Sequence, residues 1–72
     1  MEATFGQWYA WGRDRVSAQL DDGRMVTILG YDRNRKRVRV MFDAGTDHER
    51  PYSFKAERIA AVFTVDAVVV AA

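Results

Sequence analysis

The fold of this chain is decided by the stretch Arg15-Val-Ser-Ala-Gln-Leu20, Asp21-Asp-Gly23, Met25-Val-Thr-Ile-Leu-Gly30 and Arg37-Val-Arg-Val-Met-Phe42. In its first and last parts, apolar and polar residues alternate, as they do in strands with one buried face. The Asp-Gly pair is a strong hairpin signal, because glycine adopts a positive φ without steric cost. The stretch therefore predicts short antiparallel strands joined by tight turns.

The flanking segments extend this pattern. Tyr52-Ser-Phe54 is expected to be a fourth strand, 55–58 one short 3₁₀ turn, and 59–65 extended chain. The polar segment 32–36 predicts a turn, and 43–51 predicts a loop. Residues 1–11 hold several aromatics, whose spacing fits either a strand or a short helix. The predicted core consists of Val16, Ala18, Ile28, Val38, Val40, Phe42 and Ile59.

Length and composition define the class of protein. The 72 residues are enough for a single domain, 1–72, with a small core. The chain has no cysteine, which excludes disulfides and thiolate metal sites and favours a reducing, cytoplasmic setting. Residues 1–11 lack the pattern of a signal peptide, and the longest apolar run, 67–72, is too short to span a bilayer. We therefore expect a cytoplasmic protein with no membrane partner.

The charges are unevenly distributed. Formal net charge is only +1, yet five of the eleven basic residues fall within 33–39. The rest of the chain carries six basic and ten acidic residues, a balance of −4. The sequence thus predicts a molecule that is basic at one end and mildly acidic elsewhere.

A known fold family shares several of these short motifs. Gly12-Arg-Asp-Arg-Val16, Asp22-Gly23 and Val38-Arg-Val-Met-Phe-Asp-Ala-Gly45 resemble the Tudor-like branch of the SH3-like barrels. The resemblance implies an all-β fold class, an SH3-like small antiparallel barrel of five to six strands with one short 3₁₀ turn. Members that read methylated ligands have aromatics where this chain has Arg24 and Ala44, so no aromatic cage is expected here.

A second, weaker resemblance is to the type B plasmid dihydrofolate reductases, which are also SH3-like barrels. It rests on Ala3-Thr-Phe-Gly6, Ile28-Leu-Gly-Tyr31 and Ala56-Glu-Arg-Ile59. That family lines a tetrameric pore with a Val-Gln-Ile-Tyr motif, whereas this chain has Glu49-Arg-Pro-Tyr52, so only the tyrosine matches. The resemblance implies the fold and self-association but not the enzyme activity.

The basic segment is the main functional signal. On a hairpin, two arginines would share one solvent face while the others surround the turn, and guanidinium groups suit phosphate. We therefore predict that a nucleic acid or nucleoprotein binds there. The alternative is a solvated strand face whose arginines serve solubility and edge protection. The candidate nucleic-acid-binding residues are Arg33, Arg35, Lys36, Arg37 and Arg39.

Aromatic side chains suggest a different ligand. Small barrels often hold peptides in aromatic grooves, so a protein–protein adaptor is the runner-up function. The alternative for these rings is that they fill the core or an interface in a short chain. The candidate groove residues are Trp8, Trp11, Tyr31 and Tyr52.

Catalysis finds little support in the sequence. His48 is the only histidine, and the serines lie on predicted strands without a nucleophile motif. A calcium loop starting at Asp43 would need glycine at His48 and an acidic ligand at Phe54. We expect no enzyme activity, catalytic residue, metal or cofactor.

The expected homo-oligomer would form through the C-terminal strand 66–72, with the N-terminal segment 1–11 contributing.

Overall fold

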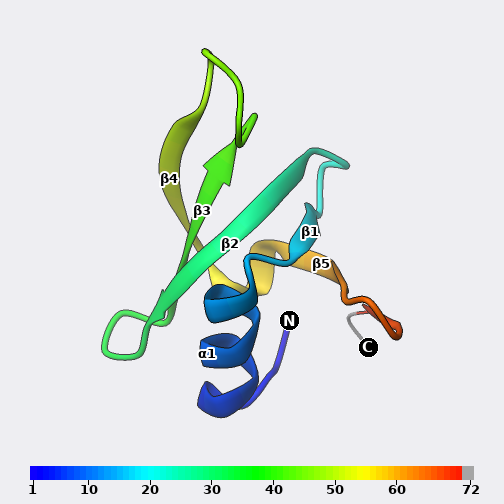
Figure 1. Ribbon diagram of the computed structural model, residues 1–72. Helices are drawn as coiled ribbons and strands as arrows, with labels where there is room; N and C mark the ends of the chain where they lie inside the picture. Colours follow the sequence, from blue (N-terminus) through cyan, green and yellow to red (C-terminus); the bar gives the residue numbers. More distant parts are fainter. Residues whose placement is uncertain (71–72) are drawn as a thin grey trace.

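The computed structural model describes residues 1–70; residues 71–72 lie outside the described part. The described chain is mostly β, with six antiparallel strands, one 3₁₀ turn and one helix (Figure 1). The predicted fold class is confirmed in these terms. The elements are α1 (Phe5–Asp14), β1 (Ser17–Leu20), β2 (Met25–Asp32), β3 (Arg37–Phe42), β4 (Arg50–Lys55), η1 (Ala56–Arg58), β5 (Ile59–Phe63) and β6 (Val68–Val70).

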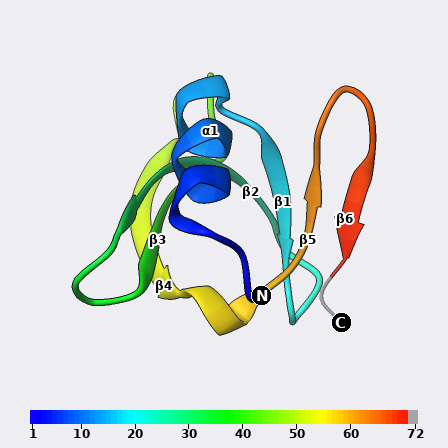
Figure 2. The same cartoon turned by 90° about the horizontal axis from the view of Figure 1, so that it is seen from below.

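The strands form one sheet in the order β4-β3-β2-β1-β5-β6. The hairpins β1–β2, β2–β3 and β3–β4 follow one another, and the chain then returns so that β5 pairs with β1. Figure 2 shows the sheet curled around a central space, with β4 and β6 as its two edges. The order is compatible with a small β-barrel, although the sheet is not closed.

The ambiguous N-terminal segment is a helix. Thr4 caps α1 through a capping box: its hydroxyl accepts from the Gln7 backbone N–H, and the Gln7 side chain accepts from the Thr4 N–H. The helix ends at Arg15, which adopts the left-handed conformation with φ 53°. It packs against β2 across the open end of the curled sheet (Figure 2).

The core lies between this helix and the concave face of the sheet. Six of the seven predicted core residues are buried, and Val16 is half-buried at the rim. The core also contains Trp8, which is 1% exposed, stacked 5.4 Å from Tyr31 and edge-on to Trp11 at 5.0 Å. The other additions are Leu20, Val26, Phe54, Ala61 and Val62.

Two glycines set the close packing of α1 on the sheet. A Cβ at Gly12 would lie 2.9 Å from both the Gly30 Cα and the Leu29 carbonyl oxygen, so only glycine fits. Gly30 itself follows an irregularity in the β2–β3 register, and glycine is common where a strand bends or is closely approached.

The C-terminal strand has a partner within the same chain. Val68–Val70 pairs with Ala61–Phe63 of β5, and the far side of β6 is an unpaired sheet edge. Val68 is 56% and Val70 68% exposed. The last two residues of the predicted interface segment lie outside the described residues. Within residues 1–70, no helix has the length and hydropathy needed to cross a bilayer.

Candidate nucleic-acid interface

The basic hairpin connects β2 and β3 as expected, and its turn is held by one carboxylate. Asp32 Oδ1 accepts from the backbone N–H groups of Asn34 and Arg35, at 3.0 and 3.2 Å. Lys36 takes the left-handed conformation with φ 54°. The basic side chains of the turn are exposed, and the ion pair of Arg35 is a single contact of 3.9 Å between its Nε and Asp32 Oδ2. The turn is therefore ordered by its backbone, leaving its cationic groups in solvent.

The two strand arginines, Arg37 and Arg39, lie on the outer face of β3. The Arg37 guanidinium donates to the hydroxyl and carbonyl oxygens of Ser53, at 3.2 and 3.4 Å, and is fixed against β4. Arg39 is exposed and extends over Gly30, where a Cβ would come within 2.6 Å of its Nη2. Because Gly30 has no side chain, the Arg39 guanidinium has room to lie over it.

Two further arginines, which the sequence interpretation missed, join this surface from the end of α1. Arg13 and Arg15 line the same pocket as Arg39, about 320 Å³ in volume. The Arg15 Nη1 donates to the carbonyl oxygens of Gly12 and Leu29, at 2.9 and 2.6 Å. They are 24 or more positions before Arg39 in the sequence, and only the packing of α1 on β2 brings them together.

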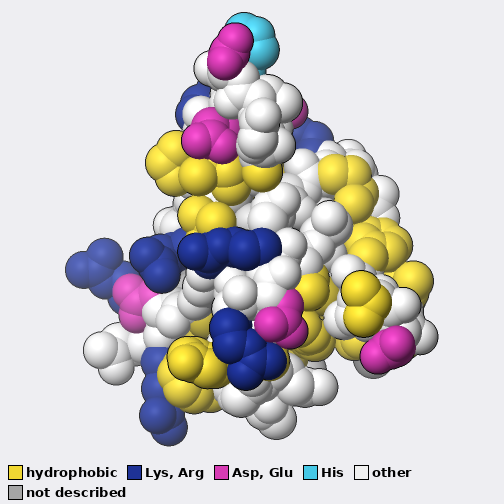
Figure 3. Space-filling view, viewed as in Figure 1, with side chains coloured by type: hydrophobic (Ala, Val, Ile, Leu, Met, Phe, Trp, Pro, Cys, Tyr) yellow, Lys and Arg dark blue, Asp and Glu magenta, His cyan; other side chains and the backbone are white. Residues whose placement is uncertain are grey.

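The seven cations form what we call the basic face: Arg13, Arg15, Arg33, Arg35, Lys36, Arg37 and Arg39. The segments 13–15 and 32–39 carry these seven and two aspartates, a balance of +5. The other positions hold four basic and eight acidic residues, a balance of −4. Figure 3 shows Lys and Arg side chains gathered on the β2–β3 side, with hydrophobic side chains beside them, and a further group of hydrophobic side chains on the opposite side. The basic face therefore keeps the same balance of charge as the hairpin segment alone, +5 against −4, but with seven cations instead of five.

The four predicted groove aromatics do not form one groove. Trp8 and Trp11 are core residues, 1% and 7% exposed, and Tyr31 is half-buried against Trp8. Trp8 and Tyr31 both line a hollow of about 600 Å³, which Arg35 and Lys36 also line, and Tyr31 lines the pocket of about 320 Å³ as well. Tyr52 is 58% exposed and lies elsewhere, on β4.

Tyr52 belongs to a separate cleft of about 270 Å³ on the concave side of the sheet, which we call the aromatic cleft. Its lining residues are Arg24, Phe42, Arg50, Tyr52 and Phe54. Positions 50, 52 and 54 alternate along β4, so they share a face, and Phe42 pairs with Arg50 across the β3–β4 ladder. The period-two alternation was the signal that could have placed Arg50 beside Tyr52. No local pattern places Arg24 there, because it comes from the β1–β2 turn.

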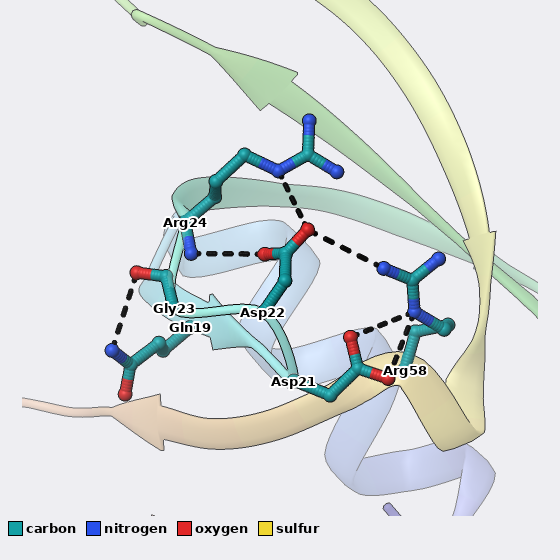
Figure 4. A network of polar contacts seen from close by, with 6 residues as sticks. All are labelled: Gln19, Asp21, Asp22, Gly23, Arg24 and Arg58. Carbon is teal, nitrogen blue, oxygen red and sulfur yellow. Dashed lines mark hydrogen bonds and ion pairs between the residues drawn. The ribbon is translucent and has the colours of Figure 1, made fainter.

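A polar network anchors one wall of this cleft (Figure 4). Asp22 accepts from the backbone N–H and from Nε of Arg24, at 3.0 and 2.8 Å, and lies 3.5 Å from Arg58 Nη2. Arg58 Nε also donates to both oxygens of Asp21. The bond from the Arg24 backbone N–H is the main reason that the pKa of Asp22 lies below its ordinary value. The network ties the β1–β2 turn to η1, 37 residues away.

The acidic loop 43–49 offers no assembled metal site. Within residues 1–70, no group of three or more His, Asp or Glu side chains is arranged to hold an ion. His48 is exposed in this loop, and its backbone N–H donates to the Thr46 hydroxyl.

Comparisons with protein-family models, with curated proteins and with solved structures find no match for this chain.

Proposed function

We propose that this chain is a non-catalytic module that binds nucleic acid through its basic face. The observation that carries the proposal is the convergence of seven cations from the helix end and from the β2–β3 hairpin on one side of the molecule, in two segments that carry only two aspartates. Six of the seven are arginines, whose planar forks suit phosphate oxygens.

The ion pairs within the basic face leave it available to a ligand. The contacts of Asp14 with Arg13 at 3.1 Å and of Asp32 with Arg35 at 3.9 Å are both solvent-exposed. Exposed pairs of this kind contribute little free energy, so a phosphate competes with them easily. Contacts to the backbone carry no base information, and the module is expected to bind different sequences about equally.

We also assign the fold to the SH3-like barrels. The strand order β4-β3-β2-β1-β5, with η1 between β4 and β5, supports this assignment together with the Tudor-like sequence pattern. The helix α1 and the strand β6 are then additions at the two ends of the domain. Since such folds host many functions, the assignment adds nothing to the choice of ligand.

The test is a fluorescence-anisotropy titration of a mixed-sequence 20-mer, single- and double-stranded, at low and at moderate salt, with both variants compared at each. The variant Arg33→Gln/Arg35→Gln/Lys36→Gln removes three exposed charges from the turn. We expect this variant to weaken binding at least tenfold, because a complex with fewer phosphate contacts releases fewer counterions. The factor should be similar for unrelated sequences.

The matched control is Val65→Glu/Ala67→Glu/Val70→Glu, which changes net charge by the same −3 at exposed positions around β6. Figures 1 and 2 place β6 on the opposite side of the molecule from the β2–β3 turn. The control should bind within about twofold of the parent at moderate salt, where charges this distant are screened. Equal losses in both variants, or no binding by the parent chain, would refute the proposal and leave a protein ligand as the next candidate.

A further inference from the structure

We propose that the aromatic cleft holds one unpaired nucleotide of a single strand, with the base stacked on Tyr52 and the adjoining phosphate on Arg24 and Arg50. The inference rests on the proposed function and deepens it, because it names single-stranded nucleic acid as the preferred ligand. A duplex cannot use the cleft in this way, since each of its bases is covered by its neighbours.

The aromatic rings provide a stacking surface that is partly prepared. Tyr52 lies 4.9 Å from Phe54 and 6.4 Å from Phe42, and these two phenylalanines meet edge to face at 5.9 Å. Both phenylalanines are 8% exposed and pack beside Tyr52, which as a whole residue is 58% exposed. An incoming base would bury this exposed ring, and every base has a π-face that suits it.

The arginines are held in place by contacts that leave donors free. The Arg24 guanidinium lies over the rings of Phe42 and Phe54, at 5.2 and 5.9 Å, and its Nε is bound by Asp22. Its two terminal nitrogens point away from Asp22 (Figure 4). The Arg50 guanidinium lies 5.7 Å from the centre of the Phe42 ring, and among residues 1–70 it has no hydrogen-bond or ion-pair partner.

The charge of the cleft favours an anion. Its five lining residues include two guanidinium groups and no carboxylate. The nearest acid of the network, Asp22, is shared between Arg24 and Arg58, and Glu49 turns its Oε2 back to the Gly45 backbone N–H at 3.0 Å. A nucleotide, whose sugar joins a planar base to a phosphate, satisfies both features of the cleft, whereas an unmodified aliphatic peptide satisfies neither.

The cleft is connected to the basic face around the edge strand β4. Tyr52 also lines a second depression, on the edge of β4, together with Arg37 and Ser53. Arg37 belongs to the basic face and donates to Ser53, the residue next to Tyr52. A single strand lying on the basic face can therefore cross the edge of the sheet and place one base in the cleft.

The test uses 5′-phosphorylated dithymidine, which is too short to cover the basic face and the cleft together. Titrated into the ¹⁵N-labelled full chain, it is expected to shift the amide signals of Arg24, Phe42, Arg50 and Tyr52. Tyr52→Ala should raise its Kd about fivefold or more, since stacking on an aromatic ring contributes about 1 kcal/mol or more per base. Val68→Ala truncates an apolar side chain that is 56% exposed on β6 and should leave the Kd unchanged.

A second variant and a second ligand keep the result unambiguous. Arg50→Gln removes the positive charge but keeps a polar side chain, and it should weaken binding of the phosphorylated dinucleotide more than that of the form lacking the 5′-phosphate. The inference is overturned if the dinucleotide shifts no cleft signal at millimolar concentration, or if an acidic peptide shifts these signals and the dinucleotide does not. The turn variant, assayed with duplex DNA, tests the proposed function separately, so either idea can fail without the other.

Discussion

Replacing Gly12 by alanine tests the packing that brings α1 onto the sheet and Arg13 and Arg15 onto the basic face. The new Cβ would stand 2.9 Å from backbone atoms of both Leu29 and Gly30, which cannot rotate away as a side chain would. Overpacking of this kind costs about 1–3 kcal/mol, and a backbone obstacle places it near the upper end. The helix propensity of alanine returns about 1 kcal/mol. The expected net loss in the free energy of unfolding is therefore about 2 kcal/mol.

Urea unfolding followed by tryptophan fluorescence measures this loss directly, because both tryptophans are buried. At about 1 kcal/mol per molar urea for a small domain, the midpoint should fall by about 2 M. Gly6→Ala is the matched control: its Cβ would meet only Thr4 Oγ1 at 3.9 Å, so it should stabilise the chain by about 0.5 kcal/mol. Equal midpoints for Gly12→Ala and the parent chain would show that α1 is not seated against β2 as described.

Three further predictions concern the turn network, the free edge and catalysis. The pKa of Asp22 is lowered in the folded state, so its ionised carboxylate stabilises the fold above the unfolded pKa of about 3.9. This stabilisation is lost as the pH falls through the folded pKa. In urea unfolding, the parent should therefore be more stable than Asp22→Asn by the full amount at pH 7 and by less below about pH 4. Val68 and Val70 are exposed on the edge strand, so we expect the chain to self-associate at high micromolar concentration, as measured by sedimentation. The variant Val68→Lys/Val70→Lys should be monomeric, and a monomeric parent chain would contradict the prediction. NADPH oxidation with dihydrofolate should not saturate above background, and a saturable rate would establish the enzyme alternative instead.

The strands and turns could be predicted from the sequence because their signals are local. The valines of β3 alternate strictly, and the Asp-Gly turn carries Gly23 at φ 92° as expected. The secondary structure of residues 1–11 could not be predicted from the spacing of the aromatic residues, because these residues have two roles. Trp8 and Trp11 fill the core, while Phe5 and Tyr9 stay at the surface. Spacing alone does not separate these roles. The capping box at Thr4 was the available signal for a helix start.

The candidate site was predictable only in part, for a similar reason. The five basic residues of the hairpin are neighbours in sequence, and their common surface follows from one turn. Arg13 and Arg15 reach the same surface through packing of α1 on β2, which depends on Gly12 and Gly30 facing each other. The groove prediction grouped Tyr52 with the tryptophans by residue type, although burial separates them in the structure. Arg24 reaches Tyr52 only because the sheet curls.

The salt dependence of DNA binding tests the central claim most directly. If the basic face grips the phosphate backbone, log K for a 20-mer duplex should fall linearly with log salt, with a slope of about −0.9 per phosphate contact, so about five contacts give a slope near −4.5. Removing Arg33, Arg35 and Lys36 together should reduce the magnitude of the slope by about 2 to 3. A parent slope near zero, or a slope that the triple variant leaves unchanged, would contradict the assignment of the basic face as the nucleic-acid interface.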